Sequence, residues 1–214
     1  MLFPVRLNPF PAGFVPLSPT SHKFMPRLAI FASGNGSNAQ RIAEYFEGHP
    51  SVSIRLILSN NPAAFVLKRA AALGIPSEVF SRNTFYDTGR IPALLRENGI
   101  DFIILAGFLW LIPPGILAAF PGRIINIHPA LLPKYGGKGM YGMRVHEAVI
   151  AAGEPESGIT IHHVDECYDE GKIIFQARCP VSPADTPETL AEKIHQLEYR
   201  YFAEVVEKIV TSDE

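Results

Sequence analysis

Asn126 and His128 are the residues whose types and spacing most directly suggest chemistry. They lie two positions apart in an apolar run that begins at Arg123, so in a β-strand both side chains leave the same face. Pro129 and Pro133 end the run, which places the pair at the carboxyl end of the strand, where open α/β sheets bind ligands. An amide N–H and an imidazolium N–H that converge on one point stabilise negative charge on an oxygen, as acyl transfer requires. The alternative is a turn-forming asparagine beside a hydrogen-bonded core histidine.

A second candidate site follows the first predicted strand, where residues 33–38 read S-G-N-G-S-N. Gly34 and Gly36 permit positive φ and close backbone approach, and Ser37 or Asn38 can cap a following helix. Free N–H groups at such a helix start can bind a phosphate, although an ordinary strand-to-helix turn explains the same residues. The segment is neither a Walker loop nor a complete G-x-G-x-x-G motif.

The pattern along the chain predicts alternating strands and helices, and therefore one α/β domain. The predicted strands cover residues 27–32, 52–58, 77–80, 101–105, 158–164 and 172–178, with a further strand in the run that begins at Arg123. The predicted helices cover residues 39–47, 61–74, 84–97, 144–152 and 187–210. Asn61 and Pro62 are expected to start the second helix, and Gly89 and Pro92 to interrupt the third.

Two segments at predicted strand ends allow more than one reading. Residues 106–112, A-G-F-L-W-L-I, are too apolar for an ordinary exposed loop, so they form either core or the wall of a pocket for a flat aromatic ligand. Residues 165–171, D-E-C-Y-D-E-G, separate two strands and by composition suit a solvated turn.

Four further polar residues lie on predicted elements. His162 and His163 are adjacent in a strand, so they point to opposite faces, which argues against a shared metal and leaves one of them facing the site. In the last helix, capped by Asp185 or Thr186, His195 and Glu198 are three positions apart on a different face from the apolar stripe. They can reach a ligand or form a solvated pair. The stripe itself comprises Leu190, Ile194, Leu197, Tyr201 and Val205.

Composition is that of an ordinary globular protein. Of the 214 residues, 47% are hydrophobic and 19% charged, and a net charge of −2 gives no general electrostatic reason to bind nucleic acid. The two cysteines, Cys167 and Cys179, are far apart and indicate neither a disulfide framework nor a zinc site. We expect reduced thiols in a cytoplasmic protein that binds no membrane and needs no metal.

Residues 1–24 differ from the rest, being rich in proline and phenylalanine without usable periodicity. The prolines leave no continuous apolar helix for a signal peptide. We expect this leader to be disordered or to result from an upstream start site, with the functional domain covering residues 25–214.

The motifs S-G-N-G-S-N, L-A-G-F, N-I-H-P-x-L-L-P-K-Y and D-x-G-x-I-I, in this order and spacing, resemble the glycinamide ribonucleotide formyltransferase family. Members are folate-dependent enzymes of purine biosynthesis, and the resemblance runs from about residue 27 to residue 210. It implies a single Rossmann-like formyltransferase domain with a mostly parallel twisted sheet and helices on both faces. It also implies transfer of a formyl group from 10-formyltetrahydrofolate to 5′-phosphoribosylglycinamide, by a monomer or homodimer.

The resemblance assigns roles residue by residue. It implies catalytic roles for Asn126, His128 and Asp169, with Asp169 holding His128 as an imidazolium. It places the substrate phosphate and ribose on Gly36, Ser37, Asn38, His195 and Glu198. It places the folate on Arg82, Leu109, Trp110, Leu111, Ile112 and Asn126.

Three features depart from the family pattern: Trp110 stands where a basic residue is usual, residues 138–143 form a longer loop, and Glu170 replaces a glycine. The competing functions are a formyltetrahydrofolate hydrolase, a methionyl-tRNA formyltransferase, or a noncatalytic nucleotide-binding module. The first two normally carry an additional domain, for which the leader and the tail are expected to be too short. The third leaves the trio of Asn126, His128 and Asp169 unexplained.

Overall fold

Seven strands form one sheet, in the order β3-β2-β1-β4-β5-β6-β7, in a computed structural model that describes residues 25–212. The strands are β1 Arg27–Phe31, β2 Ser53–Ser59, β3 Ser77–Val79, β4 Phe102–Leu105, β5 Ile124–His128, β6 Glu156–His163 and β7 Ile173–Pro180. The helices are α1 Ser37–Tyr45, α2 Phe65–Ala72, α3 Arg82–Tyr86, α4 Arg90–Glu97, α5 Pro114–Ala119, α6 Met143–Ala151 and α7 Pro187–Thr211. The leader, residues 1–24, lies outside the described residues.

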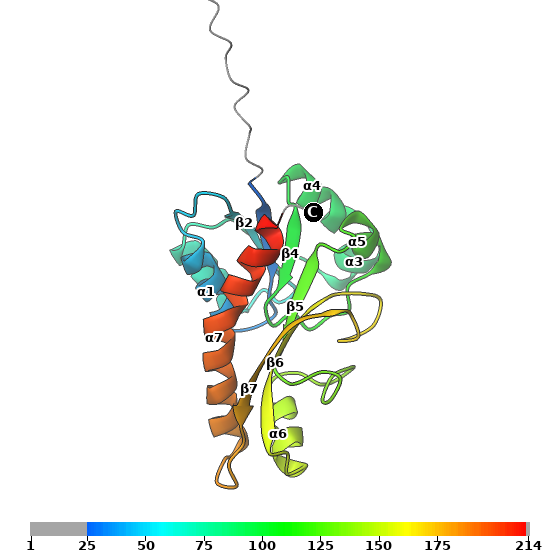
Figure 1. Cartoon of the computed structure of the whole chain (residues 1–214). Helices are drawn as coiled ribbons and strands as arrows, with labels where there is room; N and C mark the ends of the chain where they lie inside the picture. The colour runs from blue at the N-terminus through cyan, green and yellow to red at the C-terminus, as the bar shows by residue number, and fades with distance from the viewer. Residues whose placement is uncertain (1–24, 213–214) are drawn as a thin grey trace, which may run out of the picture.

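The sheet is mostly parallel, as predicted. Strands β3, β2, β1, β4 and β5 run parallel, whereas β6 and β7 complete one edge in antiparallel order (Figure 1). The pairing of β5 with β6 places Asn126 opposite His162 and His128 opposite Thr160. The acidic turn between β6 and β7 is therefore attached to the strand that neighbours β5.

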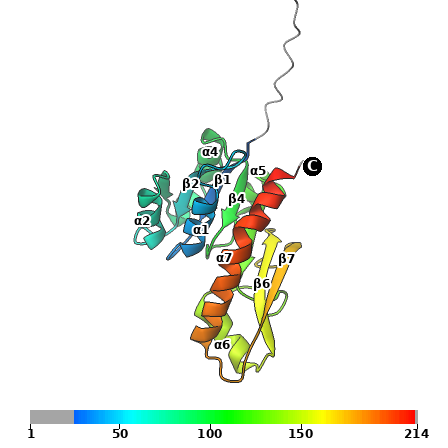
Figure 2. The ribbon, with the colours of Figure 1, turned by 60° about the vertical axis from the view of Figure 1, so that its left-hand side comes forward.

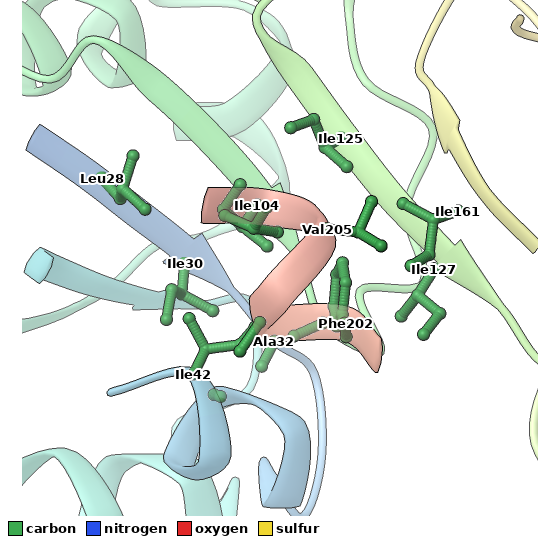
Figure 3. Close-up of a cluster of buried hydrophobic side chains, with 14 of the residues drawn as sticks. Leu28, Ile30, Ala32, Ile42, Ile104, Ile125, Ile127, Ile161, Phe202 and Val205 are labelled. Atoms are coloured by element: carbon green, nitrogen blue, oxygen red, sulfur yellow. The ribbon is translucent and has the colours of Figure 1, made fainter. Parts of the chain in front are cut away.

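Helices cover both faces of the sheet, and each face has its own apolar core. On one face, Ile125, Ile127 and Ile161 pack against Phe202 and Val205 of α7 (Figure 3). Helix α7 runs beside β6 and β7, with α1 and α6 on the same side (Figure 2). The second core is formed by side chains of α3, α4 and α5 with the alternate residues of the central strands. Alternation along β5 puts Asn126 and His128 on one face and Ile125 and Ile127 on the other.

Helix α1 begins at Ser37, two residues earlier than predicted. Its N-cap is Gly36, whose φ of 75° is left-handed, so Ser37 and Asn38 are its first two residues. The prediction that one of these side chains caps the helix is therefore wrong. Glycine fits the position because a left-handed N-cap is strained for other residues. The N–H groups of the first turn are left without intrahelical acceptors.

The next two predicted helices agree with the prediction only in part. Helix α2 begins at Phe65 and not at Asn61, because the Asn61 side chain accepts from the Ala63 N–H and forms a separate turn. As expected, Gly89, with φ of 64°, interrupts the helix predicted over 84–97 and divides it into α3 and α4. Pro92 lies in the first turn of α4 and does not break it, since a missing N–H is tolerated there.

Helix α7 starts as predicted, with Thr186 forming a reciprocal capping box with Thr189. The predicted position of Glu198 on this helix needs correction. Glu198 is only 7% exposed, and it lies one turn from buried Ile194 and one turn from buried Phe202. The carboxylate is thus on the buried side of the helix, not on a solvated face, whereas His195 is exposed. Within residues 25–212, no helix has the length and apolarity to cross a membrane.

Candidate active site

A cavity of about 620 Å³ opens over the carboxyl ends of β1, β4 and β5. Its walls come from residues 33–38 after β1, 106–109 after β4, 126–129 of β5 and its extension, and the loop 137–142. Tyr168 and Asp169 of the acidic turn, Arg144 and His146 of α6, and His195 and Glu198 of α7 complete it. The fold therefore brings the two candidate sites of the sequence into one cavity, as expected for an open α/β sheet.

Asn126 and His128 converge on Asp169. Asn126 Nδ2 lies 3.4 Å from Asp169 Oδ1, and His128 Nδ1 lies 3.4 Å from Oδ2. The trio that the family resemblance implies is thus brought together at one point. The Asp169 side chain is 11% exposed, and a buried carboxylate requires donors. The acidic turn is thus not solvated at this residue.

The backbone at Asp169 is arranged for this contact. Its φ is 59°, a left-handed conformation that few non-glycine residues adopt, and Oδ2 accepts from the Gly137 N–H at 3.0 Å. Burial raises the pKa of the Asp169 carboxyl, whereas the His128 ring and the Gly137 N–H lower it. The net result is a pKa below the ordinary value, which keeps the carboxylate ionised.

The His128 ring is held by the carbonyl of Tyr135. His128 Nε2 lies 2.7 Å from that oxygen, and since a carbonyl only accepts, Nε2 carries a proton. Tyr135 also has a left-handed φ, 56°, which aims its carbonyl at the ring. Burial lowers the pKa of His128, opposed by Asp169 and the Tyr135 hydrogen bond, and the net shift is downward. Both ring nitrogens face oxygen acceptors, Nε2 the Tyr135 carbonyl and Nδ1 the Asp169 carboxylate, and the expectation that Asp169 keeps His128 as an imidazolium stays a prediction.

Of the two adjacent histidines, His162 faces the site. It is 2% exposed, its Nδ1 lies 2.8 Å from the His163 carbonyl, and its Nε2 lies 3.0 Å from Asn126 Nδ2. His163 instead lines a separate cavity with His49 and Glu207. Period-two alternation predicts that only one of the pair reaches the site, but the choice between them depends on the register of β6 against β5.

The loop 33–38 is held by α2. A side chain at Gly36 would collide with Val66, and the Val66 N–H donates to the Gly34 carbonyl at 3.2 Å. The Arg69 guanidinium donates to the Asn35 carbonyl at 2.9 Å and to its Oδ1 at 2.8 Å. These contacts hold the loop so that the first turn of α1 faces the cavity with free N–H groups, an anion-binding arrangement.

Polar side chains from α1, α6 and α7 complete this end of the cavity. Asn38 Nδ2 donates to Glu198 Oε2 at 2.9 Å, and burial raises the pKa of Glu198 despite Asn38 and His195. Sequence reasoning missed His146, which is 3% exposed, with Nδ1 buried and no hydrogen-bond partner for that atom. Its position between Val145 and Val149, on the apolar side of α6, is the signal that could have identified it.

The predicted folate residues are divided between the cavity and its surroundings. Leu109 lines the cavity, is 43% exposed, and donates its N–H to Ser33 Oγ at 3.0 Å. Trp110 belongs to an aromatic cluster with Phe80, Phe85, Tyr86 and Phe108.

Arg82, Leu111 and Ile112 also lie outside the cavity wall. The Arg82 guanidinium stacks 4.9 Å from the ring of Tyr86 and 5.5 Å from that of Trp110. The Leu111 carbonyl accepts from the Tyr86 hydroxyl at 3.0 Å, and Ile112 is core. Residues 106–112 are thus partly cavity wall and partly packing.

Comparison with known proteins agrees with this geometry. A family model described as formyl transferase matches residues 26–206. The chain belongs to the formyl transferase family. The family resemblance drawn from the motifs is therefore confirmed. Among residues 25–212 of this formyl transferase, no group of three or more His, Cys, Asp or Glu side chains is placed to hold a metal ion.

Individual relatives agree on one activity. The chloroplastic phosphoribosylglycinamide formyltransferase of Arabidopsis thaliana is 42% identical over 186 residues, covering 84% of this chain and 64% of the relative. The phosphoribosylglycinamide formyltransferase of Bacillus subtilis is 37% identical over 191 residues, which cover 87% of this chain and 95% of the relative. The crystal structure of that enzyme from Streptococcus pneumoniae superposes with a TM-score of 0.77 at 39% identity, covering 86% of this chain and 99% of that one. The chain spans 64% and 60% of the length of its Arabidopsis and Vigna unguiculata relatives.

Proposed function

We propose that this formyl transferase moves the formyl group of 10-formyltetrahydrofolate to the amine of 5′-phosphoribosylglycinamide, a step of purine biosynthesis. The observation that carries the proposal is one cavity with an anion-binding loop at one end and the trio of Asn126, His128 and Asp169 at the other. Relatives named for this reaction, at 37% to 42% identity, support it.

The amine attacks the formyl carbon, and negative charge develops on the formyl oxygen. The Asn126 amide and the His128 ring are the donors that meet this charge. Their 3.4 Å distances to Asp169 are long for hydrogen bonds, so these donors are weakly engaged and can turn to a developing oxyanion. The 2.7 Å contact to the Tyr135 carbonyl keeps the His128 ring in place meanwhile.

Asp169 and His128 together move the proton. The ionised carboxylate accepts it from the attacking nitrogen, directly or through water, and the pair returns it to the leaving nitrogen of the folate. The low pKa of Asp169 keeps it available as the carboxylate that takes this proton. His128 in the imidazolium form donates from Nδ1, and Asp169 stabilises the charge of the ring.

The other end of the cavity binds the phosphorylated substrate. Phosphate lies on the N–H groups around Gly36, Ser37 and Asn38, because a helix N-terminus favours anions. Glu198 accepts from the ribose hydroxyls, with His195 beside it at the cavity mouth. The distance between the phosphate site and Asp169 selects the substrate, because only an amine at the matching distance from its phosphate reaches the formyl carbon.

The folate lies on the Leu109 side of the cavity, near Asn126. Its flat ring system lies against the exposed Leu109 side chain, with Trp110, Leu111 and Ile112 supporting this segment from outside the cavity wall. Arg82 offers a cation for its acidic tail. Since Arg82 already stacks on Trp110, tail binding at this position competes with that stack. We further propose that the enzyme needs no metal, works in the cytoplasm, and is a monomer or homodimer, the last tested by sedimentation equilibrium.

The decisive assay supplies purified protein with 10-formyltetrahydrofolate, with and without 5′-phosphoribosylglycinamide, and follows tetrahydrofolate release. Release that depends on the amine, with the formylated product found by mass spectrometry, supports the proposal. Release without the amine identifies a hydrolase, and no release with bound phosphorylated ligand identifies a binding module. Transfer to methionyl-tRNA is measured in parallel.

A further inference from the structure

His162 is a buried histidine whose two ring nitrogens both have partners. Nδ1 lies 2.8 Å from the His163 carbonyl, and a carbonyl oxygen only accepts, so Nδ1 carries the proton. In the neutral ring, Nε2 is then an acceptor. The Asn126 Nδ2 group, 3.0 Å away, is the donor that meets it.

This tautomer decides which way the Asn126 amide faces. With Nε2 as acceptor, the amide turns its NH₂ group and not its oxygen toward His162. The same NH₂ group faces Asp169 Oδ1 at 3.4 Å. In the flipped amide, the side-chain oxygen would face this carboxylate oxygen, and the two acceptors would repel each other. Both neighbours therefore select the same orientation of the amide.

The two N–H bonds of this amide are engaged unequally. The contact to His162, at 3.0 Å, has the length of an ordinary hydrogen bond, whereas the contact to Asp169, at 3.4 Å, is long. His162 Nε2 lies 3.6 Å from Asp169 Oδ1, which is beyond hydrogen-bond distance. The hydrogen bond of this ring nitrogen is therefore made with Asn126 and not with Asp169. One N–H is anchored, and the other can turn to a ligand.

We propose that His162 is a positioning residue for formyl transfer: it anchors one N–H of Asn126 and thereby presents the second to the formyl oxygen. The inference rests on the proposed function, since it gives Asn126 its oxyanion partner. His162 itself does not line the cavity wall, so it touches neither substrate. Its effect passes through Asn126.

Two substitutions separate the two ring nitrogens. In His162→Gln, the side-chain oxygen reaches the position of Nε2 and accepts from Asn126. In His162→Asn, the shorter amide replaces Nδ1 alone and leaves Asn126 unanchored. Losing the anchor is expected to lower kcat about tenfold or more in His162→Asn, with KM for the phosphorylated substrate little changed. His162→Gln is expected to retain kcat within about threefold of wild type.

Three outcomes overturn the proposal: both variants keep wild-type kcat, both lose it equally while folded, or only His162→Gln loses it. A double-mutant cycle sharpens the test, since His162→Asn is expected to have no further effect once Asn126 is alanine. Additive losses contradict an effect transmitted through Asn126.

One measurement is independent of turnover and of variant folding. In ¹⁵N-labelled wild-type protein, a hydrogen bond from Asn126 Nδ2 to His162 Nε2 gives a scalar coupling between the two nitrogens. Its absence at neutral pH overturns the anchor. If the coupling is present and the wild-type enzyme does not transfer the formyl group, the proposed function has failed while the anchor stands.

Discussion

The two ends of the cavity are built on different physical principles. At the proposed phosphate end, backbone N–H groups of α1 face the cavity, and the loop is fixed by the Val66 contact with Gly36 and by the Arg69 hydrogen bonds to Asn35. At the reactive end, buried polar side chains face one another, and two non-glycine residues, Tyr135 and Asp169, adopt left-handed backbone conformations.

The difference assigns different tasks to the two ends. Backbone donors held by packing bind ground state and transition state alike, so changes there are expected to act on stability and KM. Buried side chains with weak mutual contacts can respond to charge that develops during reaction, so changes there are expected to act on kcat.

The largest effect is expected for Asp169→Asn. Removing the carboxylate is expected to lower kcat by about a thousandfold, because proton transfer and imidazolium stabilisation are both lost. Steady-state kinetics with both substrates measure it, and Glu170→Gln, one residue further along the acidic turn, is the matched control with near-wild-type kcat. Equal turnover in the two variants would remove Asp169 from the mechanism.

The same variant is expected to change the titration of His128. Asp169 raises the pKa of His128 against the effect of burial, so its removal is expected to lower that pKa further. Histidine NMR titration of wild type and Asp169→Asn measures the shift. A higher pKa in the variant contradicts the coupling described above.

Asn126→Ala is expected to lower kcat about a hundredfold, the usual effect of losing one oxyanion donor. The fold is expected to persist, because the neighbouring isoleucines of β5 remain in their cores. Circular dichroism and thermal unfolding provide the control. Retention of near-normal kcat would show that this end of the cavity does not depend on the amide.

Gly36→Ala tests the phosphate end. The new methyl group collides with Val66 on a backbone that is already left-handed, so we expect a loss of about 2–4 kcal/mol in unfolding free energy and a raised KM for the phosphorylated substrate. Gly34→Ala is the matched control, because a Cβ there meets nothing within 4 Å. A Gly34 variant as unstable as the Gly36 variant contradicts the explanation.

His146 gives the smallest effect, on stability as a function of pH. Burial, aided by the neighbouring His195 and His128 rings, lowers its pKa from 6.5 to about 4. Between pH 6.5 and pH 4, this histidine is therefore protonated in the unfolded chain but not in the folded protein. The free energy of unfolding falls as the pH drops through this window, by roughly 3 kcal/mol at most. In His146→Leu, denaturant unfolding is expected to show a shallower decline across this window, with exposed His195→Gln as control.

Local sequence patterns were sufficient to predict much of the secondary structure. The periodicity of the apolar runs predicted the central strands, and the two-residue spacing of Asn126 and His128 predicted that they share a face. The threonine at position 186 and the proline after it predicted the start of α7. These features depend on neighbours within a few positions, where sequence spacing and spatial distance are nearly the same thing.

The sequence by itself determined the sheet, the family motifs and the residues available for chemistry. Only the tertiary structure decided that Glu198 is buried, that His162 and not His163 meets Asn126, and that Arg82 stacks on Trp110. It also decided that both donors converge on Asp169. The physical reason is that burial, register and the pKa values of coupled groups depend on contacts between residues distant in the chain, which no local pattern encodes.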